Sequence, residues 1–434
     1  MNRQLLYLNH IKITNFSEFS GNYVLEEFSN IIGELYGAGF VGGYTTILKN
    51  SRCSNLFIGR FSIVEENVII GEKELKKSSL SNHFFAYGDL GGFKDSEYFN
   101  KIRTRRYFYE KKKYVFIGND VFIGKNSIIK EGVNIGNGAI ILPNSFVDKD
   151  IPDYAVVGGS PAKLIDYRFD NIIINEISQC KWWKKDLSSI FNCQSIDYTR
   201  ISDVLDKIKK TKCKDLFLKR INVNTINSSI LDVSHIESFV TGPSHIELWK
   251  NYINENKLTQ PSSFLLYPIP AVSLFSNQLE KLIFWGRDFF KNIVLFVPDF
   301  RIGNIGAFDE KIRDARFINP NYMSDEISIQ CYSLGRDKLN IFSSLGNVKF
   351  IFWCLFGRES FNKKEGKYIE NGEYKHPIWN YEDIINIYNK HVFDVRNDFY
   401  DITDLVVDQS IHPTLGCYKK LDEFITNKLK CNIY

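Results

Sequence analysis

Residues 114–150 read YVFIGNDVFIGKNSIIKEGVNIGNGAIILPNSFVDKD, and this stretch decides the fold. One aliphatic residue recurs in it at every sixth position: Ile117, Ile123, Ile129, Ile135, Ile141 and Val147. Two positions before each lies a second candidate for the interior: Val115, Val121, Ser127, Val133, Ala139 and Ser145. The same phase is present upstream, at Ile58, Val64 and Ile70.

A period of six fits neither a helix nor a hairpin, because helices repeat every 3.6 residues and strands alternate every two. A parallel β-helix does fit. Each hexapeptide then supplies one short, flat face, and its aliphatic residue stacks on the equivalent residues above and below. The glycines that follow the aliphatic residue, Gly118, Gly124 and Gly136, suit the tight corners between faces.

Composition sets the broad class of protein. A chain of 434 residues is long enough for two domains. With 24% charged and 44% hydrophobic residues, it has the make-up of a globular protein. A formal net charge of +4 is small for this length and argues against a nucleic-acid-binding protein.

The eight cysteines are scattered, with no C-x-x-C pair and no histidine at zinc-ligand spacing. We therefore expect buried free thiols and no metal. The N-terminus lacks the apolar core of a signal peptide, and no segment has the apolar length needed to span a bilayer. These features predict a cytoplasmic protein without a transmembrane segment.

The repeat is interrupted between Gly71 and Tyr114 by about forty residues that have no hexapeptide phase. This excursion contains SNHFF at residues 81–85 and the basic run KIRTRRYFYEKKK at residues 101–113. A long excursion from a rigid scaffold usually carries function, so we expect functional residues here.

The hexapeptides, the loop with SNHFF and the closing VVGGSPAKLIDYRF together resemble the xenobiotic acetyltransferase branch of the hexapeptide-repeat acyltransferases, over about residues 35–190. The resemblance implies a left-handed parallel β-helix, a homotrimer, and acetyl-CoA in the groove between neighbouring β-helices. It also implies that His83 is the essential histidine. Its imidazole is a suitable base near pH 7 for removing the proton of a hydroxyl that attacks a thioester.

For acetyl-CoA, the resemblance implies contacts from coil backbone and from a few residues near the end of the repeat. The matching positions are Lys125, Pro143, Lys149 and Lys163. We expect Lys163, in the SPAK sequence, to meet a phosphate of CoA. Asp166 stands where the family often has a basic residue, which weakens a phosphate contact there unless Arg168 compensates.

Beyond the repeat, residues 196–235 have the pattern of a charged helix and a connector. The apolar runs ESFVTG, FLLYPI, NIVLFVPDF and NVKFIFWCLF then alternate with helical patterns, which predicts a parallel sheet with helices on both faces. We therefore expect an acetyltransferase domain at 1–195 with its excursion at 72–114, a helical linker at 196–235, and an α/β domain at 236–434.

Three pieces of the last domain, in order, resemble the SGNH family of esterases and acyltransferases: Ser244 in GPSH, Asn304 after NIVLFVPDF, and Asp408 with His412 in DQSIH. The resemblance implies a three-layer α/β fold with Ser244 as nucleophile, the Asp408–His412 pair as its activator, and Asn304 as an oxyanion ligand. Serine acyl transfer needs these three roles. The sequence departs from the family pattern in reading GPS where GDS is usual, and in spacing Asp408 and His412 by four residues.

Together these features predict an acetyl-CoA-dependent O-acetyltransferase that modifies sugar hydroxyls of a bacterial capsule or other surface polysaccharide. Three alternatives remain open. The last domain is a glycan-binding module, or it is a second acyl-handling centre that acts as an esterase or transferase, or the β-helix serves only to trimerise the chain. The acceptor group is also open, because His83 would serve an amino sugar nitrogen equally well.

Overall fold

The computed structural model describes residues 4–14, 19–73, 80–81, 83, 96–102, 113–191, 196–212, 214–226, 228–242, 246, 248–250, 253, 263–268, 276–297, 325–352, 361–362, 367–368, 386–395, 398–399 and 415–431. The chain forms two compact units. Unit 1 comprises residues 1–225 and 229–231, and unit 2 comprises residues 226–228 and 232–434.

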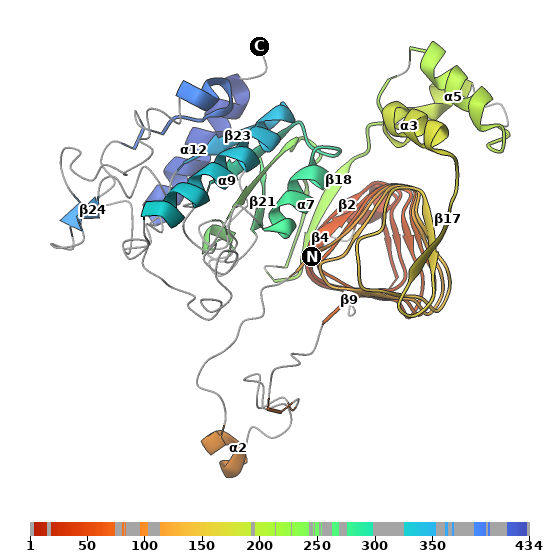
Figure 1. The fold of residues 1–434 in the computed structure, drawn as a ribbon, viewed down its shortest axis with the longest axis horizontal. Coiled ribbons are helices and arrows are strands. Elements are labelled where there is room, and N and C mark those ends of the chain that lie inside the picture. The colour runs from red at the N-terminus through yellow and green to blue at the C-terminus, as the bar shows by residue number, and fades with distance from the viewer. Residues whose placement is uncertain are drawn as a thin grey trace. The chain divides into compact units, whose positions relative to one another are not determined.

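Unit 1 is a parallel β-helix, seen end-on in Figure 1. Its strands are β1 (Lys12–Ile13), β2 (Phe19–Glu26), β3 (Asn30–Ile31), β4 (Glu34–Val41), β5 (Thr46–Ile47), β6 (Arg52–Ser54), β7 (Leu56–Ile58), β8 (Ile63–Val64), β9 (Ile69–Glu72), β10 (Val115–Ile117), β11 (Phe122–Ile123), β12 (Ile128–Lys130), β13 (Asn134–Ile135), β14 (Ile140–Ile141), β15 (Phe146–Val147) and β16 (Ala155–Gly158). Among the described residues, these strands pair with one another in parallel, as the period of six predicts.

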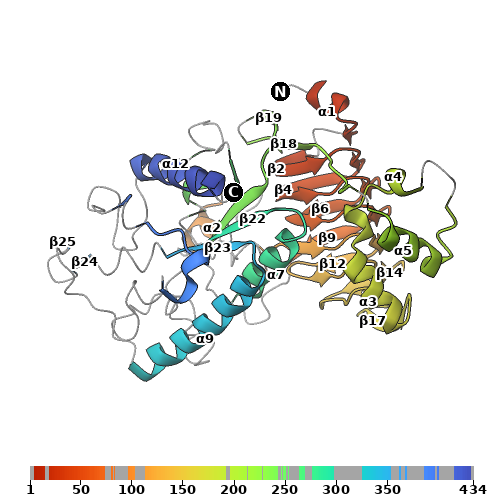
Figure 2. The ribbon, with the colours of Figure 1, turned by 90° about the horizontal axis from the view of Figure 1, so that it is seen from above.

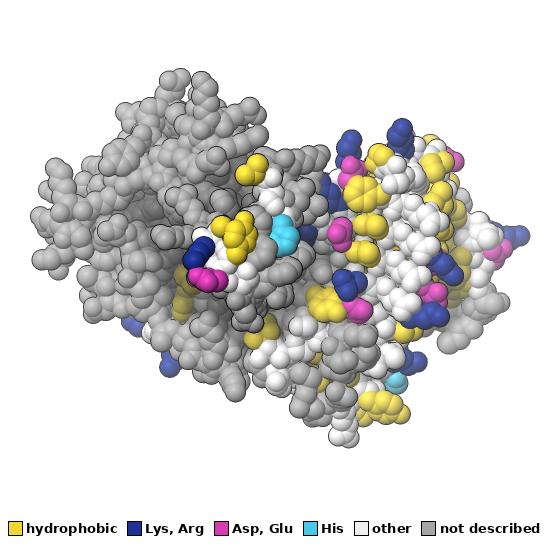
Figure 3. All heavy atoms as spheres, turned by 90° about the horizontal axis from the view of Figure 1, so that it is seen from below, with side chains coloured by type: hydrophobic (Ala, Val, Ile, Leu, Met, Phe, Trp, Pro, Cys, Tyr) yellow, Lys and Arg dark blue, Asp and Glu magenta, His cyan; other side chains and the backbone are white. Residues whose placement is uncertain are grey.

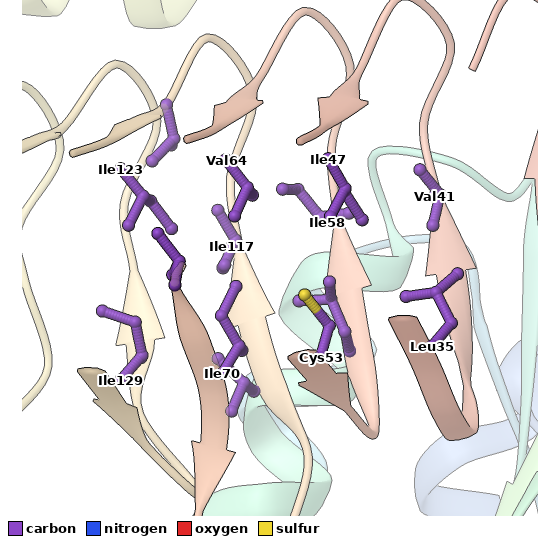
Figure 4. Packing of buried hydrophobic residues seen from close by; sticks show 14 of the residues in the cluster. Leu35, Val41, Ile47, Cys53, Ile58, Val64, Ile70, Ile117, Ile123 and Ile129 are labelled. Atoms are coloured by element: carbon purple, nitrogen blue, oxygen red, sulfur yellow. The ribbon is translucent and has the colours of Figure 1, made fainter. Parts of the chain in front are cut away.

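Three ladders of inward-facing residues run along the coil, one for each face. Face A carries Ile13, Ile31, Ile47, Val64, Ile123, Ile141 and Val157. Face B carries Phe19, Leu35, Cys53, Ile70, Ile129 and Val147. Face C carries Leu25, Val41, Ile58, Ile117, Ile135 and Ile151. Figure 4 shows ten of these side chains pointing into the interior.

The two sets of residues predicted for the interior between 114 and 150 are all buried, so this part of the prediction is confirmed. The buried hydroxyls within these sets are satisfied locally. Ser127 and Ser145 both donate to the carbonyl oxygen of Leu142, at 3.1 Å and 2.5 Å. Hydroxyls can therefore occupy the interior without the cost of an unpaired polar group.

The coil begins well before residue 35, where the predicted resemblance starts. Its inward residues keep the period of six from Ile13 to Ile31, but the next steps in register are shorter. Ile31 is followed by Leu35 after four residues, and Cys53 is followed by Ile58 after five. Each shortened step restarts the phase, which is why the repeat upstream of Ile58 is not evident in the sequence.

Two corners of the coil are lined by residues with positive φ. At the corner between faces A and B, a column of asparagines joins side chain to side chain: Asn50, Asn67, Asn126 and Asn144. At the corner between faces C and A, rings stack about 5 Å apart in the column His10, Phe28, Tyr44 and Phe61. Asparagine adopts left-handed backbone readily. For the aromatic residues this backbone is unfavourable, and the stacking along their column compensates for it.

A hairpin and several helices close the coil. β17 (Lys163–Tyr167) pairs antiparallel with β16. Then come α3 (Asn171–Cys180), η4 (Trp182–Lys184), α4 (Leu187–Phe191) and α5 (Ile201–Lys210). The carboxylate of Asp170 caps α3 by accepting from the backbone N–H of Ile173 at 2.9 Å. Of these helices, α5 lies in the segment in which the sequence pattern indicates a charged helix, and the other three precede it. Two other short helices are α1 (Gln4–Leu8) and, within the excursion, α2 (Glu97–Ile102).

The segment predicted as a connector also contains strands. β18 (Arg220–Asn224) pairs antiparallel with β2, and β19 (Ser229–Asp232) pairs with β18. The sequence does not reveal this pairing, because its partners are almost 200 residues apart. The 11-stranded sheet of the β-helix therefore includes chain from beyond the predicted end of the first domain at residue 195.

Unit 2 contains a four-stranded sheet in the order β21 (Leu265–Pro268), β20 (Ser238–Gly242), β22 (Asn292–Phe296) and β23 (Val348–Ile351). All three pairings are parallel, and all four strands lie in the predicted apolar runs. Figures 1 and 2 show α7 (Asn277–Gly286) and α9 (Asp325–Ser344) on one face and α12 (Leu415–Cys431) on the other. The remaining elements are the hairpin β24 (Phe361–Asn362) and β25 (Lys367–Tyr368), and η7 (Asn389–His391).

Among the described residues, Cys53, Cys180 and Cys417 form no disulfide. Cys53 occupies an inward position of face B, and burial raises the pKa of its thiol. Burial also raises the pKa of Cys417, to about 12. Both thiols are therefore protonated near neutral pH and fill space in the core. Among the helices that the structure describes, none has the length and apolar character to cross a membrane.

Candidate active site

The excursion that carries His83 leaves the coil after β9 and returns at β10. Of its first part, the structure describes residues 80–81 and 83. The side chain of His83 is half-buried, and its backbone N–H donates to the hydroxyl of Ser81 at 3.1 Å. Such a bond between residues two apart is typical of a serine turn. The hydroxyl of Ser81 thus holds the backbone N–H of His83 locally, outside the regular coil.

Two of the residues predicted to contact acetyl-CoA stack directly at the corner between faces A and B. Lys125 and Pro143 are both exposed, and the backbone N–H of Asn144 donates to the carbonyl of Lys125 at 2.8 Å. The coils approach so closely here that a Cβ atom on Gly124 would lie 2.6 Å from the nitrogen of Pro143. The glycine that precedes Lys125 is therefore required by the close approach.

Lys163 lies near the same corner. It begins β17 and pairs with Gly158, and a Cβ atom on Gly158 would lie 3.2 Å from Cβ of Leu142, the neighbour of Pro143. The structure thus gathers Lys125, Pro143 and Lys163 at one corner near the end of the coil. All three are exposed, so this corner is open to a ligand.

Lys149 lies one corner further along the coil. It is exposed in the turn between β15 and Ile151, at the corner between faces B and C. The excursion leaves the coil at this same corner, because β9 and β15 both pair with β12. Lys149 is therefore separated from the other three predicted residues by the width of face B.

Arg168 does not compensate for the acidic Asp166. Its guanidinium forms an ion pair with Asp120 at 2.9 Å and donates to the carbonyl of Gly138 at 2.7 Å. Burial raises the pKa of Asp120, against the opposing attraction of Arg168. Arg168 therefore holds the corner between faces C and A, while Asp166 is exposed on β17.

A buried ion-pair network was not predicted from the sequence. Glu26 is fully buried; Arg60 holds both its oxygens, at 2.6 and 2.9 Å, and Arg220 donates to one at 3.2 Å. Burial alone raises the pKa of Glu26, but the attraction of Arg60 and Arg220 outweighs it and leaves that pKa below its ordinary value. Arg60 also donates to the carbonyls of Trp183 and Leu216, at 3.3 and 3.2 Å.

Residues 114–149, the six repeats around β10 to β15, match the family model described as bacterial transferase hexapeptide. The chain is 30% identical over 168 residues to a chloramphenicol acetyltransferase of Agrobacterium fabrum, which covers 38% of this chain and 76% of that relative. The chain belongs to the hexapeptide-repeat acetyltransferases. It is an enzyme that transfers acetyl groups.

Other relatives of this acetyltransferase match over shorter segments. It is 46% identical over 74 residues to a chloramphenicol acetyltransferase of Morganella morganii, covering 17% of this chain and 35% of that relative. It is 45% identical over 76 residues to a probable macrolide acetyltransferase of Lysinibacillus sphaericus, covering 18% and 42%. The chain thus spans well under two thirds of these two relatives.

Among solved structures, a hexapeptide-repeat acetyltransferase from Vibrio cholerae, VCA0836, is 20% identical with a TM-score of 0.26, covering 39% of this chain and 82% of that one. The polySia-specific acetyltransferase NeuO is 22% identical with a TM-score of 0.25, covering 35% and 68%. We draw no functional conclusion from likenesses of this size.

Unit 2 of this acetyltransferase contains the second predicted site. The carboxyl ends of its parallel strands share one edge of the sheet, where ligands bind in folds of this kind. The predicted nucleophile follows the end of β20 and the predicted oxyanion ligand follows β22. All four predicted residues, Ser244, Asn304, Asp408 and His412, lie outside the described residues.

The end of β20, two residues before Ser244, is closely packed. Gly242 has φ +155°, and a Cβ atom there would lie 2.8 Å from Cβ of Phe296 and 2.9 Å from its carbonyl oxygen. The hydroxyl of Thr241 donates to the carbonyl of Tyr267 at 2.7 Å. The backbone that leads into the GPSH sequence is therefore fixed by strands on either side.

Proposed function

We propose that this protein transfers the acetyl group of acetyl-CoA to a sugar hydroxyl of a bacterial surface polysaccharide, such as a capsule or lipopolysaccharide O-chain, with His83 as general base. The observation that carries this proposal is the position of His83. It lies where the hexapeptide repeat is broken, on an excursion from an otherwise regular coil whose family transfers acetyl groups.

The reaction needs one base and no covalent enzyme intermediate. His83 removes the proton of the acceptor hydroxyl as its oxygen attacks the thioester carbonyl, and the carbon–sulfur bond then breaks. The leaving thiolate takes the proton from the imidazolium, which returns the neutral base. General-base catalysis of this kind contributes about 10²–10⁴-fold to a rate.

We assign the CoA portion to the exposed corner that holds Lys125, Pro143 and Lys163. Two ammonium groups there would meet phosphate groups, and the proline ring would give an apolar surface to the rest of the molecule. Lys149, one corner away and on the side of the excursion, would meet a phosphate only if the ligand crosses face B.

The fold favours an oligomer, and we assign the coil the left hand and the trimeric state of its family. The outward side of face A carries an apolar row in register: Ile63, Phe122, Ile140 and Val156. Ile63 is 42% exposed, and Ile165 on the adjoining β17 is 60% exposed. A second copy of the chain would remove such residues from water.

We propose that unit 2 is an SGNH-like three-layer domain that handles the acetylated glycan. Its strand order supports this proposal, since the chain enters the sheet at β20, moves to β21 on one side and then crosses to β22 and β23 on the other. That reversal creates a site at the carboxyl ends of the strands. We assign Ser244, activated by Asp408 and His412 and assisted by Asn304, to that site as an esterase or second transferase, in the cytoplasm.

The test incubates a candidate capsular oligosaccharide and acetyl-CoA with wild type, His83→Ala or Ser244→Ala, and follows the added acetyl mass by mass spectrometry. We expect only His83→Ala to abolish the mass gain. His235→Ala is a matched control, since that histidine is exposed in unit 2. If Ser244→Ala abolishes the gain and His83→Ala does not, unit 2 is the transferase and the proposal is wrong.

A second assay, ester hydrolysis, separates a catalytic role of unit 2 from a glycan-binding role. Hydrolysis of a small acetyl ester that is lost in Ser244→Ala and in His412→Ala would make the protein bifunctional. An unchanged background rate in both variants would make unit 2 a glycan-binding module. Replacing the acceptor by an amino sugar tests whether nitrogen is acetylated instead of oxygen.

A further inference from the structure

Besides the basic run at residues 101–113, the chain has a second region rich in positive charge. Residues 171–219 contain ten lysines and arginines against six aspartates and glutamates, a net charge of +4 that equals that of the whole chain. The densest part is KIKKTKCKDLFLK at residues 207–219, with six lysines and one aspartate. We name this part the lysine segment. On the face of the molecule drawn in Figure 3, basic and acidic side chains of the described residues are interspersed with hydrophobic ones.

All six lysines of the segment are exposed to solvent, and so is its single phenylalanine: Lys207, Lys209, Lys210, Lys212, Lys214, Lys219 and Phe217. Phe217 is 70% exposed. The one acidic residue of the segment, Asp215, already forms an ion pair with Lys185 at 2.9 Å. The segment therefore presents cations and one aromatic ring to the solvent.

The lysine segment is fixed to the β-helix. The backbone N–H of Leu216 donates to the carbonyl of Lys184 at 2.7 Å, and the carbonyl of Leu216 accepts from Arg60 at 3.2 Å. Leu218 is buried against Gly43, where a Cβ atom would lie 2.3 Å from its methyl carbon. Phe217 lies between these two anchored residues, so its backbone is already ordered. Little conformational entropy is therefore lost when its ring contacts a ligand.

Three of the lysines are partly occupied by neighbours. Lys209 and Lys210 form ion pairs with Glu176 at 3.1 Å and Asp206 at 3.0 Å, and Lys207 lies over the ring of Phe191 at 4.7 Å. Among the residues that the structure describes, no ion pair joins the ammonium groups of the other three: Lys212, Lys214 and Lys219. These three are the strongest candidates for an external anion.

We propose that the lysine segment binds an anionic glycan, so that the acceptor polysaccharide carries carboxylate or phosphate groups. This inference rests on the proposed function and names its substrate class. Ammonium groups would pair with the acidic groups, and the ring of Phe217 would pack on the apolar face of a sugar. An extended polymer can contact a region of this kind while another of its residues reaches the catalytic loop.

An anionic membrane fits the segment less well. A helix that adsorbs to a bilayer inserts its apolar face among the lipids. The apolar residues of α5 instead pack within unit 1, where Leu205 and Ile208 are buried and Ile201 and Val204 partly buried. That leaves Phe217 as the exposed apolar residue of the lysine segment, too little area for stable insertion.

The test measures binding of an oligogalacturonate to the full chain at low salt, with a malto-oligosaccharide of equal length as the neutral comparison. The variant Lys212→Ala/Lys214→Ala/Lys219→Ala is compared with Lys12→Ala/Lys49→Ala/Lys419→Ala, which removes three exposed lysines elsewhere. We expect at least about tenfold weaker binding in the first variant, less than about twofold in the second, and a smaller salt dependence in the first. Phe217→Ala should weaken binding a few-fold at every salt concentration.

Several results would overturn the inference. These are equal losses in both triple variants, equal binding of the neutral oligosaccharide, or tighter binding of phosphatidylglycerol vesicles or a single-stranded oligonucleotide than of oligogalacturonate. Binding is measured without acetyl-CoA, so it is independent of catalysis. If acetyl transfer to a small sugar fails while oligogalacturonate still binds through these lysines, the proposed function fails and the anion-binding surface stands.

Discussion

Both units contain parallel strands around a buried interior. They differ in how far apart the paired residues of neighbouring strands lie in the sequence. Outside the excursion, residues that pair in parallel between successive coils of the β-helix are 16 to 18 positions apart. In unit 2 the corresponding separations are 26, 54 and 55. The first spacing repeats one local rule, whereas the second requires a helix between every two strands.

This difference in sequence separation affects where functional residues can lie in each unit. In the β-helix each inward residue meets its own kind above and below, as Ile123 meets Val64 and Ile141. These side chains fill the interior, so a substrate cannot reach it. Candidate functional residues of unit 1 therefore lie at an outer corner of the coil, as Lys125 does, or where the repeat breaks or ends, as His83 and Lys163 do. In unit 2, Ser244 and Asn304 follow the ends of β20 and β22 in the sequence.

The largest effect on stability is expected at the buried carboxylate of unit 1. Glu26→Gln leaves Arg60 and Arg220 buried beside a neutral amide, so we expect a loss of about 3–5 kcal/mol in the free energy of unfolding. Glu66→Gln removes the half-buried partner of the exposed Lys49 and should cost about 0–1 kcal/mol. Urea unfolding followed by hydrogen exchange in unit 1 measures both. Equal losses would contradict the ion-pair assignment.

The interaction of Glu26 with its two arginines also makes the free energy of unfolding depend on pH in a defined direction. The pKa of Glu26 is lowered in the folded state, so its contribution is fully present above the ordinary glutamate pKa of about 4.3. It is lost as the pH falls through the lower, folded value. The difference in stability between wild type and Glu26→Gln should therefore be constant near neutrality and shrink below about pH 4.3. A difference that grows on acidification would contradict this.

Sequence reasoning predicted the repeats and the four parallel strands because both depend on local patterns. Ile117 and Ile123 follow a period of six without interruption, and apolar runs such as NIVLF mark buried strands. It did not predict the coil from Ile13 onward, because the register shifts at Leu35 and Ile58 hide the period.

The parts of the site that depend on distant contacts could not be predicted. Arg60 meets Glu26 across 34 positions and Leu216 across 156, and nothing in the local pattern joins them. The gathering of Lys125, Pro143 and Lys163 followed from a family resemblance, and its geometry comes from the pairing of β16 with β17. The role of His83 remains a prediction, since only its place on the excursion is known.

The comparison of the two units is tested most directly by matched core variants. Ile123→Ala opens a cavity between Val64 and Ile141, and Ile293→Ala opens one between Phe239 and Val348. Each should cost about 2–5 kcal/mol. Hydrogen exchange resolved by segment should show faster exchange only in the unit that carries the substitution. Equal acceleration in both units would mean that they unfold as one.

A smaller effect is expected where β20 ends. Gly242→Ala forces a Cβ atom against Phe296 in a backbone conformation that favours glycine, which should cost about 1–3 kcal/mol. Gly346→Ala is the control, because it has φ +78° but nothing within 4 Å of the added atom. Thermal unfolding of unit 2 should rank Gly242→Ala below Gly346→Ala. The reverse order would mean that close packing at β20 is unimportant.

The smallest effect is expected in the asparagine column at the corner of the β-helix. The amide of Asn126 accepts from Asn67 at 3.2 Å and donates to Asn144 at 3.1 Å, but the column is exposed, so each bond is worth little. Asn126→Ala should cost about 1 kcal/mol, mostly from its φ of +59°. Asn126→Gly removes the same bonds without that strain and should cost less, as measured by urea unfolding. Because Asn126 follows Lys125, a raised KM for acetyl-CoA in both variants would show that the column also positions the proposed CoA corner.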